Sequence, residues 1–340
     1  MMDEMLITNN IILKLDIEVQ IEEIIEWISQ LSKLLTESQN SSKDPKVEIL
    51  FSIKRISTAI KNDLSKKIYL GSLDDVIKKI PKSDNVEIVR YDNSYILRVD
   101  EGYIIISDNN TITCFLSEHV TDQNLMLIKF FLNAVFVLSS DIFVLHGNIV
   151  VDNKSRSTLI LGNKRSGKTT LSLLLKYKGM NWLCDDIVYV SRTGNYITVP
   201  FRYYTNIRNK TFSNFEPFLK SLGVEILDSD NERKRVHWNS LNSVKYSTVK
   251  KINQIIFPEI DEDNPICLKK KEETINLKGW ELTDTVVMGL LRPLSILSED
   301  FRKGRSSLVF EKIPHFDFTY NFDYLENSDE INDLITKMEY

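Results

Sequence analysis

Only three cysteines occur in the sequence, and no two of them form a C-x-x-C pair. Cys114, Cys184 and Cys267 lie far apart, which is typical of reduced thiols and argues against a disulfide framework. The first residues are acidic, with no basic stretch before an apolar run, so we expect no signal peptide. A cytoplasmic location is therefore predicted.

Long apolar runs are also missing. The most hydrophobic stretch, residues 125–140, contains Lys129 and Asn133 and predicts a buried core helix over 122–138 rather than a membrane span. Basic residues are not in excess, because the formal net charge is −5, which argues against non-specific wrapping of nucleic acid. We therefore expect neither a membrane nor a nucleic acid as a partner.

Composition sets no other unusual limit. With 42% hydrophobic and 27% charged residues among 340, the chain can form one large domain or two of ordinary size. Neither an internal repeat nor a low-complexity tract is present. An ordinary globular protein with a sizeable core is the expectation.

One segment has the spacing G-x-x-x-x-G-K-T, between an apolar strand predicted over 157–161 and a helix that runs to about Tyr177. In such a phosphate loop (residues 162–169), backbone N–H groups and the helix N-terminus point at phosphate oxygens. Lys168 is expected to reach the β- and γ-phosphates of ATP, and Thr169 to bind Mg²⁺. The residues expected to bind the nucleotide are Gly162, Asn163, Lys164, Arg165, Ser166, Gly167, Lys168, Thr169 and Thr170.

Two adjacent carboxylates, Asp185 and Asp186, interrupt an apolar run that predicts a strand over 182–190. Because burial of unpaired charge is unfavourable, a metal or a phosphate-bearing substrate explains them, with a surface pair at a strand end as the alternative. Neighbouring side chains of a strand point to opposite faces, so the two carboxylates are expected to have different roles. His146 lies in a strand predicted over 142–151, as either a site residue or a core histidine.

The N-terminal part predicts an amphipathic helix over 16–36, followed by a polar linker. Its apolar seam favours packing on its own domain, and a short coiled coil with a second chain, hence a homo-oligomer, is the alternative. Closely spaced strands then predict a small antiparallel unit, at 47–55, 86–91, 94–99, 102–107 and 111–117, with a short helix near 73–80.

Beyond residue 190 the patterns are weaker. The charge runs 231–235 and 269–271 are expected to lie on solvated faces. The remaining expected elements are strands at 196–202, 255–258 and 307–312, and helices at 211–222, 280–291 and 329–337.

In order and spacing, residues 145–190 resemble the HPr kinase/phosphorylase superfamily. The matching residues are Leu145-His146-Gly147, the phosphate loop, Lys178-Gly179 and the run Leu183-Cys184-Asp185-Asp186-Ile187-Val188. The resemblance implies an α/β P-loop kinase domain of the HPr-kinase/PEP-carboxykinase type that uses ATP and Mg²⁺. The expected organisation is an N-terminal helix and linker at 1–40, a small α+β domain at 41–140 and the kinase domain at 141–340.

The resemblance also implies roles for single residues. Lys168 would hold the phosphates, Asp185 would deprotonate the acceptor hydroxyl, and His146 would stand near the transferred phosphoryl group. Thr169 and Asp186 would hold Mg²⁺, although the reverse assignment of the two carboxylates stays open. Whether Arg202 or Arg305 assists the γ-phosphate stays open at this point.

The chain lacks the glycine-rich Glu-Arg-Gly-type segment of the enzymes that phosphorylate HPr. In this it resembles related kinases that phosphorylate a serine of ribosomally made peptides, including lasso-peptide precursors. The expected partner is therefore a peptide or small protein with a Ser or Thr acceptor. Two alternatives are a kinase for a small hydroxylated molecule and a nucleotide-gated binding module without catalysis.

Overall fold

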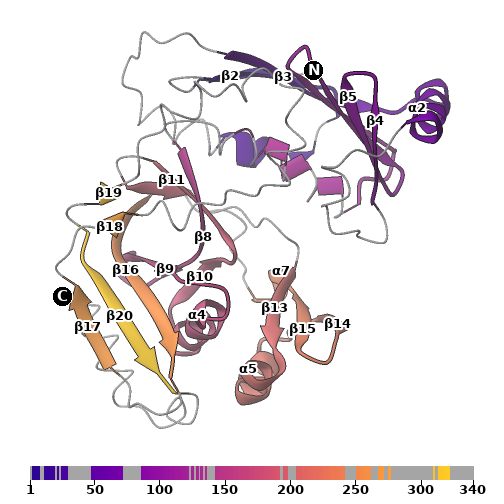
Figure 1. Ribbon diagram of the computed structural model, residues 1–340. Coiled ribbons are helices and arrows are strands. Elements are labelled where there is room, and N and C mark those ends of the chain that lie inside the picture. The colour runs from indigo at the N-terminus through magenta and orange to yellow at the C-terminus, as the bar shows by residue number, and fades with distance from the viewer. Residues whose placement is uncertain are drawn as a thin grey trace. The chain divides into compact units, whose positions relative to one another are not determined.

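The computed structural model covers residues 1–340. It describes residues 2–7, 11–19, 21–22, 24–29, 47–71, 86–121, 124–125, 128–129, 131–132, 135, 142–191, 194–197, 204–241, 250–261, 267–271, 275–276, 309–310 and 313–321. The chain forms two compact units, with the described residues up to Phe143 in the first and those from Val144 onward in the second. The architecture is mixed α/β, with several sheets and few helices in the described part (Figure 1).

A seven-stranded sheet forms the centre of the first unit. Its strands are β1 (Met2–Ile7), β2 (Ile11–Ile17), β3 (Val47–Arg55), β4 (Val86–Tyr91), β5 (Ser94–Val99), β6 (Gly102–Ser107) and β7 (Thr111–Leu116). Their order across the sheet is β1-β2-β3-β7-β6-β5-β4. Strands β4 to β7 form the predicted antiparallel meander, but β3 runs parallel to both β2 and β7, so the sheet is not purely antiparallel.

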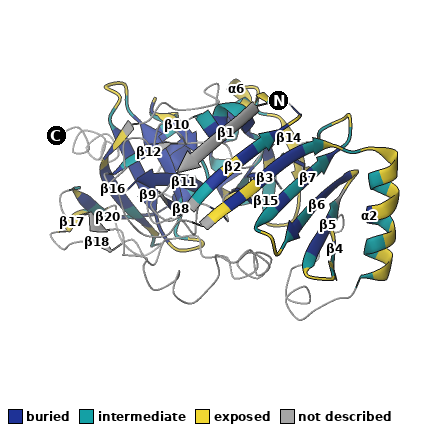
Figure 2. Ribbon diagram, turned by 90° about the horizontal axis from the view of Figure 1, so that it is seen from above, coloured by how far each residue is buried: buried dark blue, intermediate teal, exposed yellow. Residues whose placement is uncertain are grey.

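Alternation of apolar and polar residues explains which face of this sheet is buried. In β3, Ile49, Phe51 and Ile53 are fully buried, whereas Glu48 and Leu50 are exposed, an alternation that is visible along β2 and β3 in Figure 2. The same alternation in β2 corrects the helix predicted over 16–36. Residues 11–17 repeat with period two and pair with β3, so the chain is extended there, whereas the described residues 22 and 24–29 are helical.

Helices of the first unit contribute buried side chains. The described residues of the predicted core helix at 122–138 are helical, and Phe131 and Leu132 are fully buried, as predicted. A helix that the sequence did not predict, α2 (Thr58–Leu70), begins at Ser57, whose hydroxyl accepts a hydrogen bond from the N–H of Ile60. Its Leu64 packs with sheet residues in an apolar cluster.

The second unit contains an eight-stranded mixed sheet. Its strands are β8 (Ile142–Val151), β9 (Ser157–Leu161), β10 (Asn181–Cys184), β11 (Ile187–Ser191), β12 (Asn195–Ile197), β16 (Lys250–Ile260), β17 (Cys267–Lys271) and β20 (His315–Tyr320). The order is β10-β8-β11-β12-β16-β20-β17, and β9 pairs with both β8 and β16. Strand β16 runs parallel to β9 and to β20, which lies beside it in Figure 1.

Helix α4 (Lys168–Tyr177) follows β9 and is buried along most of its length. Its leucines at positions 171 and 173–175 pack in one core with Ile160, Trp182 and Phe318. A run of leucines with so few polar positions fits a helix enclosed on most sides. The first turn of α4 is therefore fixed against the sheet.

Smaller elements complete the unit. A three-stranded sheet has the order β13 (Tyr204–Arg208), β15 (Arg233–His237) and β14 (Ile226–Ser229), and a strand pair joins β18 (Ile275–Asn276) to β19 (Val309–Phe310). The helix predicted over 211–222 is interrupted at Phe215, which separates α5 (Asn209–Asn214) from α6 (Glu216–Ser221). A further short helix, α7 (Trp238–Leu241), follows β15.

The remaining predictions are corrected, confirmed or left untested. Strand β16 continues through Pro258 to Ile260, so the proline does not end it. The charge run 231–235 enters strand β15, but its residues are exposed or half-buried and those of 269–271 are exposed, so the predicted solvated faces are confirmed. The helices predicted at 73–80, 280–291 and 329–337, like Arg202 and Arg305, lie outside the described residues. None of the described helices is long and apolar enough to cross a membrane.

Candidate functional site

The predicted phosphate loop has the expected setting, because β9 ends at Leu161 and α4 begins at Lys168. Gly167 is the N-cap residue of α4 with φ +97°, a conformation that favours glycine, and Arg165 also has a positive φ of +76°. The side chains at positions 163–165 are exposed. Thr170 is also predicted to bind the nucleotide. Its hydroxyl shares a buried hydrogen bond of 3.0 Å with the hydroxyl of Thr211, and its backbone N–H is one of the first N–H groups of α4, which have no acceptor within the helix.

Lys168 lies against its own loop. Its Nζ atom donates hydrogen bonds to the carbonyl oxygens of Gly162 at 2.8 Å and Asn163 at 3.1 Å. Burial lowers the pKa of the Lys168 ammonium, and the negative charges of Asp186 and Asp185 oppose that shift. The ammonium of Lys168 is thus held by the carbonyl groups of the phosphate loop, within reach of the negative charges of Asp185 and Asp186.

The predicted strand 182–190 is broken at the two carboxylates, which corrects the sequence analysis. Asp185 and Asp186 form a bend between β10 and β11. Asp186 has φ +72°, and the N–H of Ile187 donates to the carbonyl of Asp185 at 3.0 Å. An i to i+2 hydrogen bond around a positive φ is the rarer and more strained kind of γ-turn. The two side chains therefore diverge because of the bend and not because of strand alternation.

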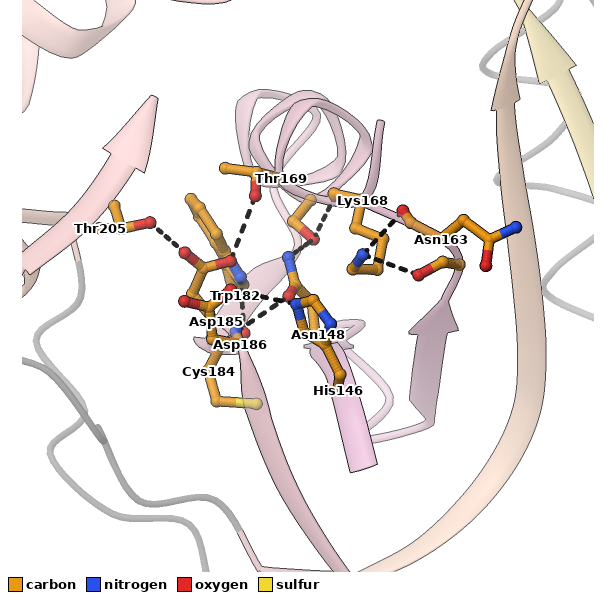
Figure 3. Close-up of polar contacts among 12 residues, drawn as sticks. His146, Asn148, Asn163, Lys168, Thr169, Trp182, Cys184, Asp185, Asp186 and Thr205 are labelled. Carbon is orange, nitrogen blue, oxygen red and sulfur yellow. Dashed lines mark hydrogen bonds and ion pairs between the residues drawn. The ribbon is translucent and has the colours of Figure 1, made fainter. Parts of the chain in front are cut away.

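Asp185 faces the phosphate-loop helix. Its Oδ1 accepts a hydrogen bond from the hydroxyl of Thr169 at 3.3 Å, and its Oδ2 accepts one from the hydroxyl of Thr205 (Figure 3). Thr205 is buried in β13, so the three-stranded sheet contributes one partner. The carboxylate beside the Thr169 hydroxyl is therefore Asp185, whereas the resemblance had paired Thr169 with Asp186.

Asp186 faces β8. Its Oδ1 lies 3.5 Å from Nε2 of His146, and both side chains are more than a third exposed (Figure 3). His146 is therefore not an enclosed core histidine. Its ring reaches Asp186 from strand β8, which also carries Asn148. Asn148 itself is fully buried and accepts a hydrogen bond from the N–H of Asp186.

Sequence reasoning missed two of these contacts, Thr205 and Asn148. Asn148 follows the Leu145-His146-Gly147 match directly, and a buried amide in an apolar strand was a usable signal because buried polar groups need partners. Thr205 carried no such signal, since the segment around it has no clear periodicity.

The oxygen atoms of Thr169 and Asp185 suit Mg²⁺, which prefers hydroxyl, carboxylate, water and phosphate oxygens. No group of three or more His, Cys, Asp or Glu side chains within the described ranges could hold a metal by itself. That is the usual situation for Mg²⁺, which binds through one or two carboxylates together with substrate phosphates. The residues present therefore fit this ion.

No family model matches the chain, and no curated protein does. A solved structure to which it is similar is that of the HPr(Ser) kinase/phosphatase from Coxiella burnetii. The sequences are 15% identical, the match covers 58% of this chain and 99% of that chain, and the TM-score is 0.29. A likeness of this degree decides nothing about activity, which has to be inferred from the residues of the site.

Proposed function

We propose that this chain is an ATP-dependent kinase that transfers the γ-phosphoryl group to a Ser or Thr hydroxyl of a peptide. The observation that carries the proposal is the presence, beside one phosphate loop, of two carboxylates with separate partners, Thr169 for Asp185 and His146 for Asp186. Nucleotide binding by itself requires the loop and one carboxylate near the metal. A second carboxylate that pairs with a histidine adds a group that can accept a proton.

Binding of the nucleotide falls to the phosphate loop in this proposal. The first N–H groups of α4 have no partner within the helix, and the helix dipole favours negative charge at that end. Lys168 would exchange its hydrogen bonds with the carbonyls of Gly162 and Asn163 for phosphate oxygens. Its charge then compensates the charge of the transferred group.

Thr169 and Asp185 would hold Mg²⁺, which supplies charge neutralisation on the phosphate oxygens when it is bound. Their 3.3 Å contact favours this pair over Thr169 and Asp186. Thr205 supports the arrangement, because its hydrogen bond fixes the second oxygen of Asp185. We therefore assign the metal carboxylate to Asp185, the reverse of the assignment that the resemblance implied.

Asp186 would take the proton of the acceptor hydroxyl at one of its carboxylate oxygens. His146, whose Nε2 lies 3.5 Å from Asp186, orients the other oxygen. A carboxylate of ordinary basicity is sufficient, since positioning and charge stabilisation account for most of phosphoryl-transfer catalysis. The partial exposure of both side chains leaves room for a hydroxyl to approach.

A peptide acceptor is proposed from the sequence resemblance to kinases of ribosomally made peptides. The test adds the purified chain, Mg²⁺ and ATP labelled at the γ-phosphate to size-fractionated extract of the producing cell. Four variants accompany the wild type: Lys168→Ala, Asp185→Asn, Asp186→Asn and the exposed control Asn153→Ala, which lies in the β8–β9 turn.

The wild type and Asn153→Ala are expected to label a peptide fraction, and Lys168→Ala to label nothing. Asp186→Asn should bind ATP as the wild type does but lose transfer by about 10²- to 10⁴-fold, as for loss of a general base. Asp185→Asn should raise the Mg²⁺ concentration that gives half the maximal rate. Label only in a small-molecule fraction would replace the peptide by a metabolite. ATP binding without any labelled acceptor would overturn the kinase in favour of a nucleotide-gated binding module.

A further inference from the structure

Asn148 is a fully buried amide in β8 that joins two parts of the candidate site. Its Oδ1 accepts a hydrogen bond from the backbone N–H of Asp186 at 3.3 Å, and its Nδ2 donates to the hydroxyl of Ser172 at 2.8 Å. Ser172 in turn donates to the carbonyl oxygen of Lys168 at 2.9 Å. A continuous set of hydrogen bonds therefore runs from the carboxylate bend to the first turn of α4 (Figure 3).

Each member of this chain of hydrogen bonds has a fixed direction. The N–H of Asp186 can only donate and the carbonyl of Lys168 can only accept, so the amide of Asn148 has one orientation that satisfies both ends. The network is buried, since Asn148 and Ser172 are both 0% exposed. Buried networks of this kind are rigid when every member is paired.

Three successive residues of strand β8, at positions 146–148, contact Asp186. His146 contacts the carboxylate, the N–H of Gly147 donates to the carbonyl oxygen of Asp186 at 3.2 Å, and Asn148 receives its N–H. Gly147 allows the close approach of the strands, because a Cβ atom there would lie only 2.8 Å from the carbonyl oxygen of Ile160.

Asp186 needs such a hold because of its backbone. A residue with a side chain at φ +72° is strained and keeps that conformation only when its surroundings impose it. Without the bond to Asn148 the N–H of Asp186 would be left without this partner, and the bend would be free to relax toward a strand. The carboxylate would then turn away from His146.

We propose that Asn148 is a positioning residue for phosphoryl transfer: by bridging the N–H of Asp186 and the hydroxyl of Ser172, it fixes the proton-accepting carboxylate relative to the first turn of the phosphate-loop helix. This inference rests on the proposed kinase function. It adds a requirement that the function does not state, since the residue touches neither nucleotide nor acceptor. A carboxylate at the same place accepts from Asp186 but cannot donate to Ser172, so an amide is specifically required.

The test compares Asn148→Leu, which is close in size and has no polar atoms, with Asn148→Asp and Ser172→Ala. Gln254→Leu is the matched control, because Gln254 is also a buried amide that donates to a buried hydroxyl, Thr158, at 2.8 Å but touches neither carboxylate. Four quantities are measured for each variant: kcat, KM for ATP, the Kd of Mg·ATP by calorimetry, and amide hydrogen exchange at Asp186 and Val150 by NMR.

Asn148→Leu is expected to lower kcat by about 100-fold, the scale of a misplacement near 1 Å, while the Kd of Mg·ATP changes by less than about twofold. Hydrogen exchange of the Asp186 amide should accelerate, whereas exchange of the Val150 amide, which lies in β8 like Asn148, should stay slow. Asn148→Asp should behave like Asn148→Leu. Ser172→Ala, which suits a helix, should give a smaller loss of kcat with the same pattern. Gln254→Leu should lower stability only.

Either of two results would overturn the inference: unchanged exchange of the Asp186 amide in Asn148→Leu, or an unchanged kcat in that variant and in Ser172→Ala. If Asn148→Leu does not fold, Ser172→Ala decides by the same measurements. If the wild type transfers no phosphoryl group, the proposed function fails, and the exchange of the Asp186 amide still decides whether Asn148 holds the bend.

Discussion

At the scale of residues, the two carboxylates differ through their partners and not through their type. Asp185 receives hydroxyl groups from Thr169 and Thr205, and Asp186 meets an imidazole. A carboxylate that accepts two hydrogen bonds has both oxygens directed, which suits a metal ligand. A carboxylate that lies beside a histidine suits the role of proton acceptor that we propose for Asp186. Thr205 is the residue that makes this distinction testable, because it contacts Asp185 alone of the pair.

Thr205→Val should weaken the metal site and leave the base in place. The variant removes a hydrogen bond to a charged oxygen, worth about 1.5–3 kcal/mol, so the Mg²⁺ concentration for half-maximal rate should rise by about 10- to 100-fold. Thr205→Ser, which keeps the hydroxyl, should restore most of it. Rates measured over a Mg²⁺ titration check this, and a loss in rate that saturating Mg²⁺ does not recover would contradict the assignment of Asp185.

The sequence predicts those parts of the site that depend on local spacing or on a charge in an apolar run. The phosphate loop is predicted because its spacing and its flanks are local, and the two carboxylates are found because charge is rare in an apolar run. Their roles were not predictable. Apolar residues surround the pair on both sides, so the run reads as one buried strand and the bend at Asp186, which separates the roles, leaves no mark in the alternation.

At the scale of elements, the start of α4 depends on strand β20. The phenol of Tyr320 donates to the carbonyl of Gly167 at 2.9 Å, and a Cβ atom on Gly167 would collide with that same phenol oxygen. Gly179, after the end of α4, has a similar φ of +95° but no heavy atom within 4 Å of the position a Cβ would take. The two glycines therefore separate backbone strain from crowding.

Gly179→Ala should lower the free energy of unfolding by about 1–3 kcal/mol, the cost of backbone strain alone, with ATP binding retained. Gly167→Ala should lower the free energy of unfolding by about 1–3 kcal/mol more than Gly179→Ala does, because of overpacking, and should also weaken ATP binding. Adding Tyr320→Phe to Gly167→Ala removes the colliding oxygen, so the double variant should lose less than the sum of the single ones. Urea unfolding with calorimetry checks this; equal losses at both glycines would refute it.

Elements were predictable where their own residues carry the pattern. The strands from β3 to β9 alternate or are continuously apolar, and the sequence places them within a residue or two. Strands β13 to β15 are missed because β15 begins with the basic residues 233–235 of a charge run, and pairing with its neighbours, rather than propensity, makes it a strand. Helix α2 is missed because its apolar stripe is narrow and its end, Tyr69 and Leu70, is exposed.

At the scale of the whole molecule, the two buried cysteines can be used to follow the unfolding of the two units separately. Cys114 is buried in the first unit and Cys184 in the second, whereas Cys267 is exposed. Burial raises the pKa of the Cys114 and Cys184 thiols, so they react slowly with alkylating reagents, which require the thiolate. Each buried thiol therefore becomes reactive when its own unit unfolds.

In native protein, maleimide should label Cys267 alone. With increasing urea, Cys114 and Cys184 should become reactive at separate midpoints, followed by mass spectrometry of each cysteine peptide. Mg·ATP at about 100 times its Kd stabilises the unit that binds it by about 2.7 kcal/mol, so the midpoint of Cys184 should rise while that of Cys114 stays. If both midpoints move together, the units unfold as one body.

The bond between Tyr320 and Gly167 also has a consequence for synthesis of the chain. The two residues are 153 positions apart, so a ribosome at about 5–20 residues per second makes the phosphate loop on the order of ten seconds before its partner strand exists. The seven described strands of the first unit's sheet, by contrast, are complete by Leu116. Nucleotide binding is then a late event in the life of the nascent chain, and a polypeptide released early keeps an intact G-x-x-x-x-G-K-T segment that lacks its support.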